Sequence, residues 1–419
     1  MKSWKSFVVD HGRGSAAVAV LIVLPFAQLF QSRIAPVFVG VAILIIAAAL
    51  LVTGRFKLQE GLANAVSDIR KNWALLASFF AIVVYAAVSA MWAPDRALAM
   101  KSALTLALLP ICVAILSHQF HLIPFVRLPV VLLLGCLSAS IALTAPYFFQ
   151  VQWFAFMGRD AELFDLNRIA VLLAGLLFCV PLIRSETQNW RIAKAIVVVL
   201  GIAAIFRSES EVAKISVVAF VLTFGVLYLL PRLEQVMVGS AVLLFCAFPV
   251  LVPLISSAIQ RLPGSLLEGG NAAHRLAIWA GYSEHLTEAL LLGHGLKSDK
   301  VHGLQGLIDD RLLQAGFPTG VTSPHNASLE IWYTLGLPGA VLGGILIFQC
   351  ACWARKNGGD KQKQVFSLFI CWYVATLFSA SFTQGWYLAT TAIVWSVAAT
   401  LLWQRSSVAT DHNASRNLA

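Results

Sequence analysis

Apolar runs close to twenty residues long recur from one end of this chain to the other. Hydrophobic residues make up 59% of its 419 residues and charged residues only 12%, about half the charged share of a soluble domain. A helix needs about 20 apolar residues to cross the hydrocarbon core of a bilayer. The runs are continuous rather than built from alternating ~10-residue segments, which argues against a transmembrane β-barrel. The sequence therefore predicts an all-α, polytopic membrane protein.

Twelve runs have the length and composition of membrane-spanning helices. They cover residues 15–31, 34–53, 73–92, 102–118, 126–147, 168–184, 191–206, 212–230, 237–256, 326–354, 364–382 and 385–403. No small-residue cleavage site with a soluble domain follows the first run, so we expect it to be retained rather than removed as a signal peptide. The predicted organisation is helices one to nine (1–255), a polar loop (256–325), helices ten to twelve (326–404) and a tail (405–419).

The placement of lysine and arginine predicts which side of the membrane each loop faces. With the N-terminus inside, the inner segments carry 18 of these residues, the short outer loops and their flanks carry 7, and the long loop holds the remaining 5 of 30. Positive residues concentrate on the cytoplasmic side. We therefore expect both termini in the cytoplasm and the 256–325 loop outside. The net charge of +10 is then an orientation signal and gives no reason to expect nucleic acid as a partner.

The outer loop is rich in histidine but lacks the spacing of a metal site. It contains five of the nine histidines, namely His274, His285, His294, His302 and His325. No pair is spaced i, i+4, no HExxH occurs and no carboxylate lies at ligand spacing, so we expect no metal or other cofactor. All seven cysteines fall within predicted spans, which excludes a disulfide framework in the loop.

Cationic side chains cluster around this loop. Within the helical stretch 271–291, Arg275, Trp279 and Tyr282 are spaced i, i+4, i+7 and share one face. If the eighth spanning helix starts early, Arg207, Glu211 and Lys214 also share one face. Arginine has a fork of donors suited to phosphate oxygens. If the substrate carries a diphosphate, Arg275 with Arg207 or Lys214 is the predicted set that binds it. Contact with lipid headgroups, or ion pairing with Glu209, Glu211 or Glu284, is the alternative.

His325 lies at the predicted outer membrane boundary, just before the tenth span. A neutral imidazole there can accept a proton from a sugar hydroxyl near neutral pH. Helix capping beside Asn326 is the simpler structural role for this pair. Arg159 and Asn167 flank the start of the sixth span, where Asn167 is a plausible N-cap. Together with Asn326 and Tyr282 they are the further candidates for substrate contact.

Other motifs do not point to a different chemistry. No phosphate-binding P-loop, dinucleotide glycine fingerprint, GxSxG elbow or DxD-like nucleotide signature is present. A lipid or solute transporter is an alternative from another class. Transporters place ionisable residues near the midplane and commonly contain inverted repeats, whereas here the charge gathers at the outer boundary and no repeat is visible.

The loop motifs resemble those of the O-antigen ligase and polymerase superfamily. They are His274-Arg275-Leu276-Ala277-Ile278-Trp279, Gly293-His294-Gly295, His325-Asn326 and Gly336-Leu337-Pro338-Gly339. The order matches the superfamily pattern R-x-x-I-W, G-x-G, H-N and G-x-x-G around one large periplasmic loop. A further family arginine, in a T-x-S-R-like turn, aligns with Glu211. This is a departure, and Arg207 or Lys214 is then expected to supply the cation.

The resemblance implies a GT-C-like fold and a glycosyltransferase of the bacterial inner membrane. Such a ligase moves a glycan from undecaprenyl diphosphate to the lipid A core oligosaccharide at the periplasmic face, without metal or ATP. A single displacement by the acceptor hydroxyl would invert the anomeric centre. By motif match, His325 becomes the base and Arg275 a diphosphate ligand. An O-antigen polymerase, whose acceptor is a second lipid-linked glycan, shares these motifs and remains the nearest alternative.

Overall fold

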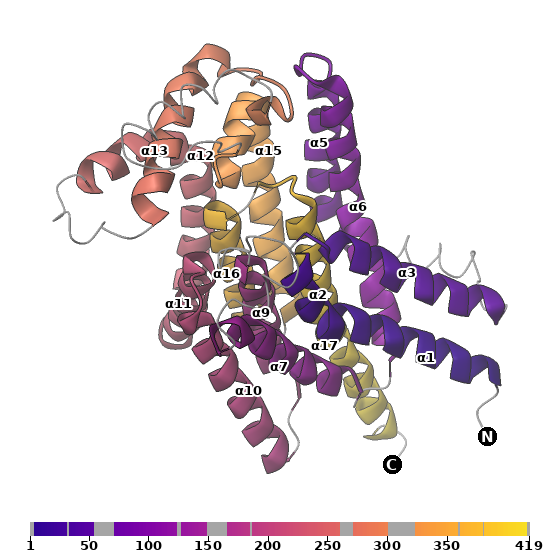
Figure 1. Ribbon diagram of the computed structural model, residues 1–419. Helices are drawn as coiled ribbons and strands as arrows, with labels where there is room; N and C mark the ends of the chain where they lie inside the picture. The colour runs from indigo at the N-terminus through magenta and orange to yellow at the C-terminus, as the bar shows by residue number, and fades with distance from the viewer. Residues whose placement is uncertain are drawn as a thin grey trace.

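The structure is a computed structural model, and it forms a bundle of helices (Figure 1). It describes residues 4–31, 33–53, 71–123, 127–148, 166–184, 187–259, 271–300, 323–358, 361–379 and 381–416, and these contain no β-strand. The N-terminal helices are α1 (Trp4–Val18), η1 (Ala19–Val23), α2 (Leu24–Phe30), α3 (Ala35–Val52), α5 (Trp73–Ser89), α6 (Arg96–His121), α7 (Arg127–Phe148), α9 (Asn167–Cys179) and η3 (Val180–Leu182). The C-terminal helices are α10 (Gln188–Arg207), α11 (Glu211–Leu229), α12 (Leu233–Ile259), α13 (Asn271–His285), η5 (Leu286–Ala289), η6 (Ser298–Lys300), α15 (Ala327–Gly358), α16 (Gln362–Ser379) and α17 (Gly385–Arg416).

A helix is present at each of the twelve predicted spans. In the described residues nine helices are long and apolar enough to cross a membrane, and α5 and the segment Asn167–Leu182 are shorter apolar helices. The twelfth predicted span corresponds to α17, and the eleventh to α16, which is not among the nine. The all-α membrane fold is confirmed, while the count of twelve and the external side of the loop remain predictions. α17 continues to Arg416, into the predicted tail.

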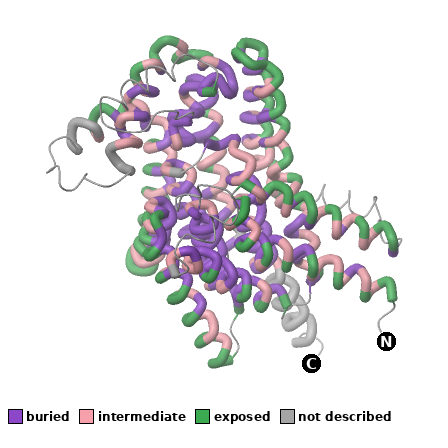
Figure 2. Tube along the Cα trace, in the orientation of Figure 1, coloured by how far each residue is buried: buried purple, intermediate pink, exposed green. Residues whose placement is uncertain are grey.

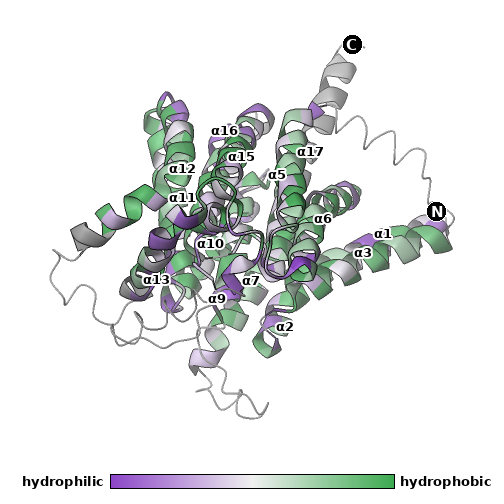
Figure 3. Ribbon diagram, turned by 90° about the horizontal axis from the view of Figure 1, so that it is seen from above, coloured by the Kyte–Doolittle hydropathy of each residue, from purple (hydrophilic) through white to green (hydrophobic). Residues whose placement is uncertain are grey.

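The short helix α9 forms the centre of the bundle. Every residue from Ile169 to Cys179 is buried, as expected for a helix that is apolar all round. It packs against α7, α10, α11, α16 and α17, and the Phe178 ring stacks on Phe220 with centroids 4.3 Å apart. Figure 2 shows buried residues concentrated here and exposed ones on the outer helices. Hydrophobic residues prevail along the long outer helices of the bundle (Figure 3), and such surfaces suit contact with lipid.

The shorter helix α13 lies at one end of the bundle, and the C-terminal end of α17 lies at the other (Figure 1). α13 packs on α12 and α15. A separate apolar cluster joins it to them and includes Phe248, Trp279, Tyr282, Leu329 and Tyr333. Of the predicted loop, the structure describes residues 256–259, 271–300 and 323–325. The site is built from these residues and from the adjacent helix ends.

The glycines of the G-x-G and G-x-x-G motifs join the loop to α15. Gly336 breaks the helical conformation of α15, with φ 63° and ψ −157°. Gly293 and Gly295 also have positive φ, which glycine adopts without steric cost. A Cβ atom on Gly336 would lie 2.6 Å from the Gly293 nitrogen, and one on Gly293 would lie 2.5 Å from Leu335. The two motifs therefore meet backbone to backbone, and this close approach requires glycine at 293 and 336.

Candidate functional site

The predicted face of α13 points into the bundle. Arg275 donates from Nη1 to the carbonyl oxygen of Phe378, close to the end of α16. Trp279, one turn further on, donates from Nε1 to the carbonyl oxygen of Pro324 at 2.8 Å. The Trp279 ring also lies 5.8 Å from the Phe378 ring. This one helix face therefore connects the end of α16 with the segment that leads into α15.

Tyr282 completes this face but lies deeper. Only 1% of it is exposed, and its ring packs edge-on against Tyr333 at 5.2 Å. Burial, together with the charges of Asp299 and Glu330, raises the pKa of Tyr282 well above its ordinary value. Such a position suits support of the helix rather than direct contact with a substrate.

His325 lies at the start of α15, directly after the carbonyl that Trp279 contacts. Its backbone has φ 48°, in the left-handed region that histidine and asparagine enter more readily than most residues. Its backbone N–H donates to Ser323 Oγ at 3.4 Å, and the residue is half-buried. Asn326 is completely buried and caps α15 by accepting the Leu329 N–H at 3.0 Å. The capping role expected for Asn326 is thus observed.

The early helix start that would place Arg207, Glu211 and Lys214 on one face does not occur. Arg207 is the last residue of α10, and α11 begins only at Glu211. Ser208 is extended, and Ser210 caps α11 with its side chain. The serines therefore close a turn that prevents an early helix start.

The three charged residues still lie at neighbouring helix ends. The exposed Arg207 places its guanidinium 4.8 Å from the centroid of the Tyr147 ring. Glu211 and the half-buried Lys214 remain neighbours at i, i+3 on α11. Burial lowers the pKa of Arg275, and the negative charge of Glu211 opposes this shift. The start of α11 therefore lies within electrostatic reach of Arg275.

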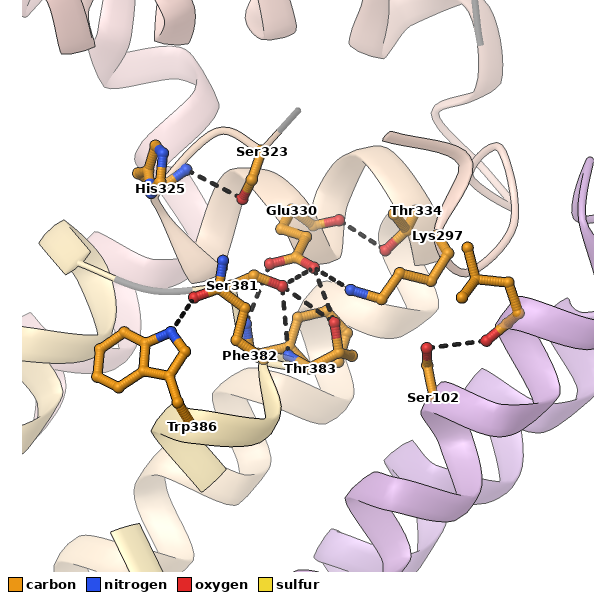
Figure 4. A network of polar contacts seen from close by, with 12 residues as sticks. Ser102, Lys297, Ser323, His325, Glu330, Thr334, Ser381, Phe382, Thr383 and Trp386 are labelled. Carbon is orange, nitrogen blue, oxygen red and sulfur yellow. Dashed lines mark hydrogen bonds and ion pairs between the residues drawn. The ribbon is translucent and has the colours of Figure 1, made fainter. Parts of the chain in front are cut away.

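A buried glutamate links α15 to the turn between α16 and α17 (Figure 4). Glu330 Oε1 accepts hydrogen bonds from Ser381 Oγ at 2.5 Å and from Thr383 Oγ1 at 3.3 Å. Its Oε2 accepts the Phe382 N–H at 3.0 Å. Lys297 Nζ lies 3.9 Å from Oε1, and both side chains are at most 5% exposed. Figure 4 shows this network together with His325 and Ser323, which precede α15.

Asp299 adds a second carboxyl group to this buried region. Both of its carboxyl oxygens are buried without a hydrogen-bond partner among the described residues. Burial and the neighbouring charge of Glu330 raise the pKa of Asp299 to about 7. The charges of Lys297 and Lys300 oppose this shift.

The other described loop histidines differ in their side-chain partners, although His294 Nε2 lies 3.4 Å from the His285 carbonyl oxygen. The His294 ring stacks on Tyr333 with centroids 4.4 Å apart, and the exposed side of α13 carries His285, whose Nδ1 lies 2.7 Å from Glu288 Oε1. Burial and the charge of Arg275 lower the pKa of His274. Among the described residues no three histidine, cysteine or carboxylate side chains are grouped as metal ligands. His302 and Arg159 lie outside the described residues.

The start of α9 brings further polar groups to this region. α9 begins at Asn167, and its N-cap position is Leu166, so Asn167 does not cap the helix as predicted. The neighbouring Arg168 places its guanidinium 5.6 Å from the centroid of the Trp386 ring. Trp386 donates to Gln384 Oε1 at 2.8 Å, directly after the turn that Glu330 holds. Arg168 was not a sequence-based candidate, although its place at a helix start resembles that of Lys214.

Sequence reasoning also missed Glu330 and its partners. The available signal was an acidic side chain four residues after Asn326 within an otherwise apolar run, a position that is costly in a membrane helix unless it is paired. The partners Ser381 and Thr383 carry no such signal, because they lie in a short turn far along the chain. Their role becomes visible only when α15 and α16 are packed together.

Nine apolar helices with the length to span a bilayer, found in the described residues, make this a multi-pass membrane protein, with a polar site at one end of the bundle. A family model described as O-antigen ligase matches residues 196–343. This match confirms the resemblance, and it supports a membrane glycosyltransferase of the O-antigen ligase and polymerase type. Comparison with curated proteins finds no match.

The matched residues contain most of the candidate site. Arg207, Lys214, Arg275 and His325 all lie within 196–343, whereas Arg159 and Asn167 precede it. Phe378 and the 381–383 turn follow it. The candidate site therefore combines the family region with the end of α16 and the turn before α17, which lie outside the match.

Glu330 offers a test of how the site is supported. Glu330→Ala is expected to lower the melting temperature clearly, because it leaves Lys297 buried without its partner, a change that typically costs about 3–5 kcal/mol. Transfer activity is expected to fall as well, since the 381–383 turn loses three hydrogen bonds. Thermal melting in detergent, followed by activity at a temperature where the variant is folded, measures both effects.

A double variant and a control variant distinguish the effect of an unpaired buried charge from the effect of losing the hydrogen bonds to the 381–383 turn. Glu330→Leu combined with Lys297→Met removes the unpaired charge and is expected to recover stability without recovering activity. Glu288→Gln changes an exposed glutamate on the same side of the molecule and serves as the control. Wild-type melting and activity in Glu330→Ala would show that this network does not support the site.

Proposed function

We propose that this protein is an O-antigen ligase that transfers a glycan from undecaprenyl diphosphate to a sugar of the lipid A core. The observation that carries the proposal is the placement of α13. Trp279 contacts the residue before His325 and also Phe378, the residue that accepts the Arg275 hydrogen bond. An imidazole and a permanent cation, fifty residues apart in the chain, thus belong to one connected structure.

The proposed reaction is a single displacement. An acceptor hydroxyl attacks the anomeric carbon of the donor glycan, and His325 accepts the hydroxyl proton. The bond between the anomeric carbon and the diphosphate oxygen breaks, and undecaprenyl diphosphate leaves with the electron pair. Attack on the face opposite the leaving group inverts the anomeric centre. No metal ion or other cofactor takes part.

Arg275 is proposed to stabilise the negative charge that develops on the leaving diphosphate. Fixed cations in a site with little water are effective there, because their orientation is set before the reaction. Lys214 and Arg207 are the proposed additional cations, from the start of α11 and the end of α10. Glu211 stands where the family has arginine, and its charge lies near Arg275. It therefore limits how much positive charge the site presents before the donor binds.

The proposal places the protein in the bacterial inner membrane with both termini in the cytoplasm. The α13 end then faces the periplasm, where the lipid-linked donor and the acceptor meet. The loop domain is taken as residues 256–325, between helices one to nine and helices ten to twelve.

Reconstitution tests the proposed function. Purified protein in liposomes, given undecaprenyl-diphosphate-linked glycan and lipid A core, is expected to form a glycosylated lipid A core without added metal. Extension of the lipid-linked glycan when the core is omitted would identify a polymerase instead. Movement of the glycan lipid or a solute across the membrane without covalent transfer would identify a transporter and contradict the proposal.

A further inference from the structure

Three consecutive leucines lie on the surface of the α13 segment, outside the spanning helices. Leu290, Leu291 and Leu292 are 46%, 69% and 56% exposed. They follow η5 and precede Gly293 of the G-x-G motif. Large apolar side chains gathered on a surface indicate a contact with a membrane or another molecule more often than a contact with water.

Hydrogen bonds at both ends of the three-leucine segment fix its backbone. The Leu337 N–H donates to the Leu290 carbonyl oxygen at 2.9 Å, and the Gly293 N–H donates to Ala289 at 2.7 Å. From the turn after α5, Trp92 Nε1 donates to the Gly293 carbonyl oxygen at 3.2 Å. Their exposure is therefore a property of an ordered structure that includes the Gly336 break in α15.

The leucines continue an apolar surface that runs down two packed helices. α5 and α15 contact one another, and each exposes a stripe of large apolar side chains at helical spacing. The stripe on α15 is Leu337, Val341, Ile345 and Phe348. That on α5 is Phe80, Val84 and Val88, and Met91 continues it in the turn after the helix. α15 belongs to the candidate membrane spans, so its stripe faces lipid in a membrane. The hydrogen bond between Leu337 and Leu290 joins the leucines directly to that stripe.

The polar boundary of this surface is also visible. The Tyr85 and Trp92 rings lie 6.3 Å apart beside the leucines, and both side chains are of the kind enriched at the membrane–water interface. Asp95 and Arg96, at the start of α6, are exposed immediately beyond them. Along the chain, the apolar stripe of α5 is thus followed by Trp92 and then by the charged Asp95 and Arg96, the order in which a bilayer changes from acyl chains to headgroups.

We propose that Leu290–Leu292, with Met91 and Trp92, form a membrane-interface anchor that inserts into the boundary between headgroups and acyl chains. Its partner is the phospholipid bilayer itself. Buried apolar area supplies the binding, as it does for interfacial helices. The predicted loop is then partly embedded rather than fully aqueous. Because the anchor follows α13 in the chain, it fixes the height of Arg275 above the membrane, a consequence that rests on the proposed function.

Spin labelling of the full-length protein in phospholipid nanodiscs tests the anchor independently of activity. Labels are placed on Leu291→Cys and, as a matched control, on Thr287→Cys, an exposed polar position four residues earlier. The four half-buried native cysteines, Cys112, Cys246, Cys350 and Cys352, are first replaced by alanine. Collision rates with oxygen, which concentrates in lipid, and with a water-soluble nickel chelate are then measured.

At position 291 the ratio of oxygen to nickel collisions is expected to be several-fold higher than at position 287. Equal access of the nickel chelate to both labels would overturn the proposal, because the leucines would then face water. Exclusion of both reagents at position 291 would also overturn it, because a second copy of the chain or another protein segment would then cover the surface.

Discussion

The variant His325→Asn is expected to lower the rate of glycan transfer by about 10²–10⁴-fold, the usual contribution of a positioned general base. Asparagine suits this test because it accepts the left-handed backbone of His325, with φ 48°, more readily than alanine does. It cannot accept the proton of the acceptor hydroxyl. Initial rates with purified protein, measured in liposomes at saturating donor, should therefore show a loss of kcat with little change in KM.

His285→Asn is the matched control. His285 also belongs to the loop, but its Nδ1 pairs with Oε1 of the exposed Glu288. This variant is expected to retain the wild-type rate. Wild-type activity in His325→Asn would remove the proposed base and leave a site that works by charge stabilisation alone. Equal losses in both variants would indicate a structural effect of loop histidines and not base catalysis.

The fold was largely predictable because the membrane imposes a simple length requirement on each helix. The predicted runs at 34–53 and 212–230 differ from α3 and α11 by no more than one residue at either end. Prediction was poorer where polar residues extend a helix beyond its apolar run, as in α1, which begins at Trp4. The break at Gly336 was not predicted, because a glycine in a span suits either close packing or a kink.

The site was predictable in its motif residues but not in their surroundings. The helical spacing of Arg275 and Trp279 placed both on one face of α13, where the structure also has them. The shared face proposed for Arg207 and Lys214 failed because capping by Ser210 sets the start of α11. The Phe378 carbonyl carries no sequence signal, since every residue has one. Only the packing of α13 on the end of α16 identifies it as the partner of Arg275.

Arg275→Lys is expected to lower transfer strongly, by about 10²–10³-fold, although it keeps the positive charge. Loss of one well-placed group that stabilises transition-state charge typically costs this much. Lysine cannot hold the Phe378 carbonyl and a phosphate oxygen with the fixed fork that arginine provides. If the charge acts in the transition state, kcat should fall while KM for the donor changes little.

The size of the Arg275 effect can be separated from a general loss of stability. Arg355→Lys is the matched control. By helix length, Arg355 lies roughly 40 Å from the start of α15, and it pairs there with Glu234. Arg355 is partly exposed, so this ion pair contributes little to stability. Its transfer rate is expected to stay close to that of the wild type. Adding Glu211→Gln to Arg275→Lys should recover part of the rate, since it removes a negative charge near the same position. Full activity of Arg275→Lys alone would show that the guanidinium fork at position 275 is not needed. The diphosphate of the donor would then be held chiefly by Lys214 and Arg207, and not by α13 as proposed.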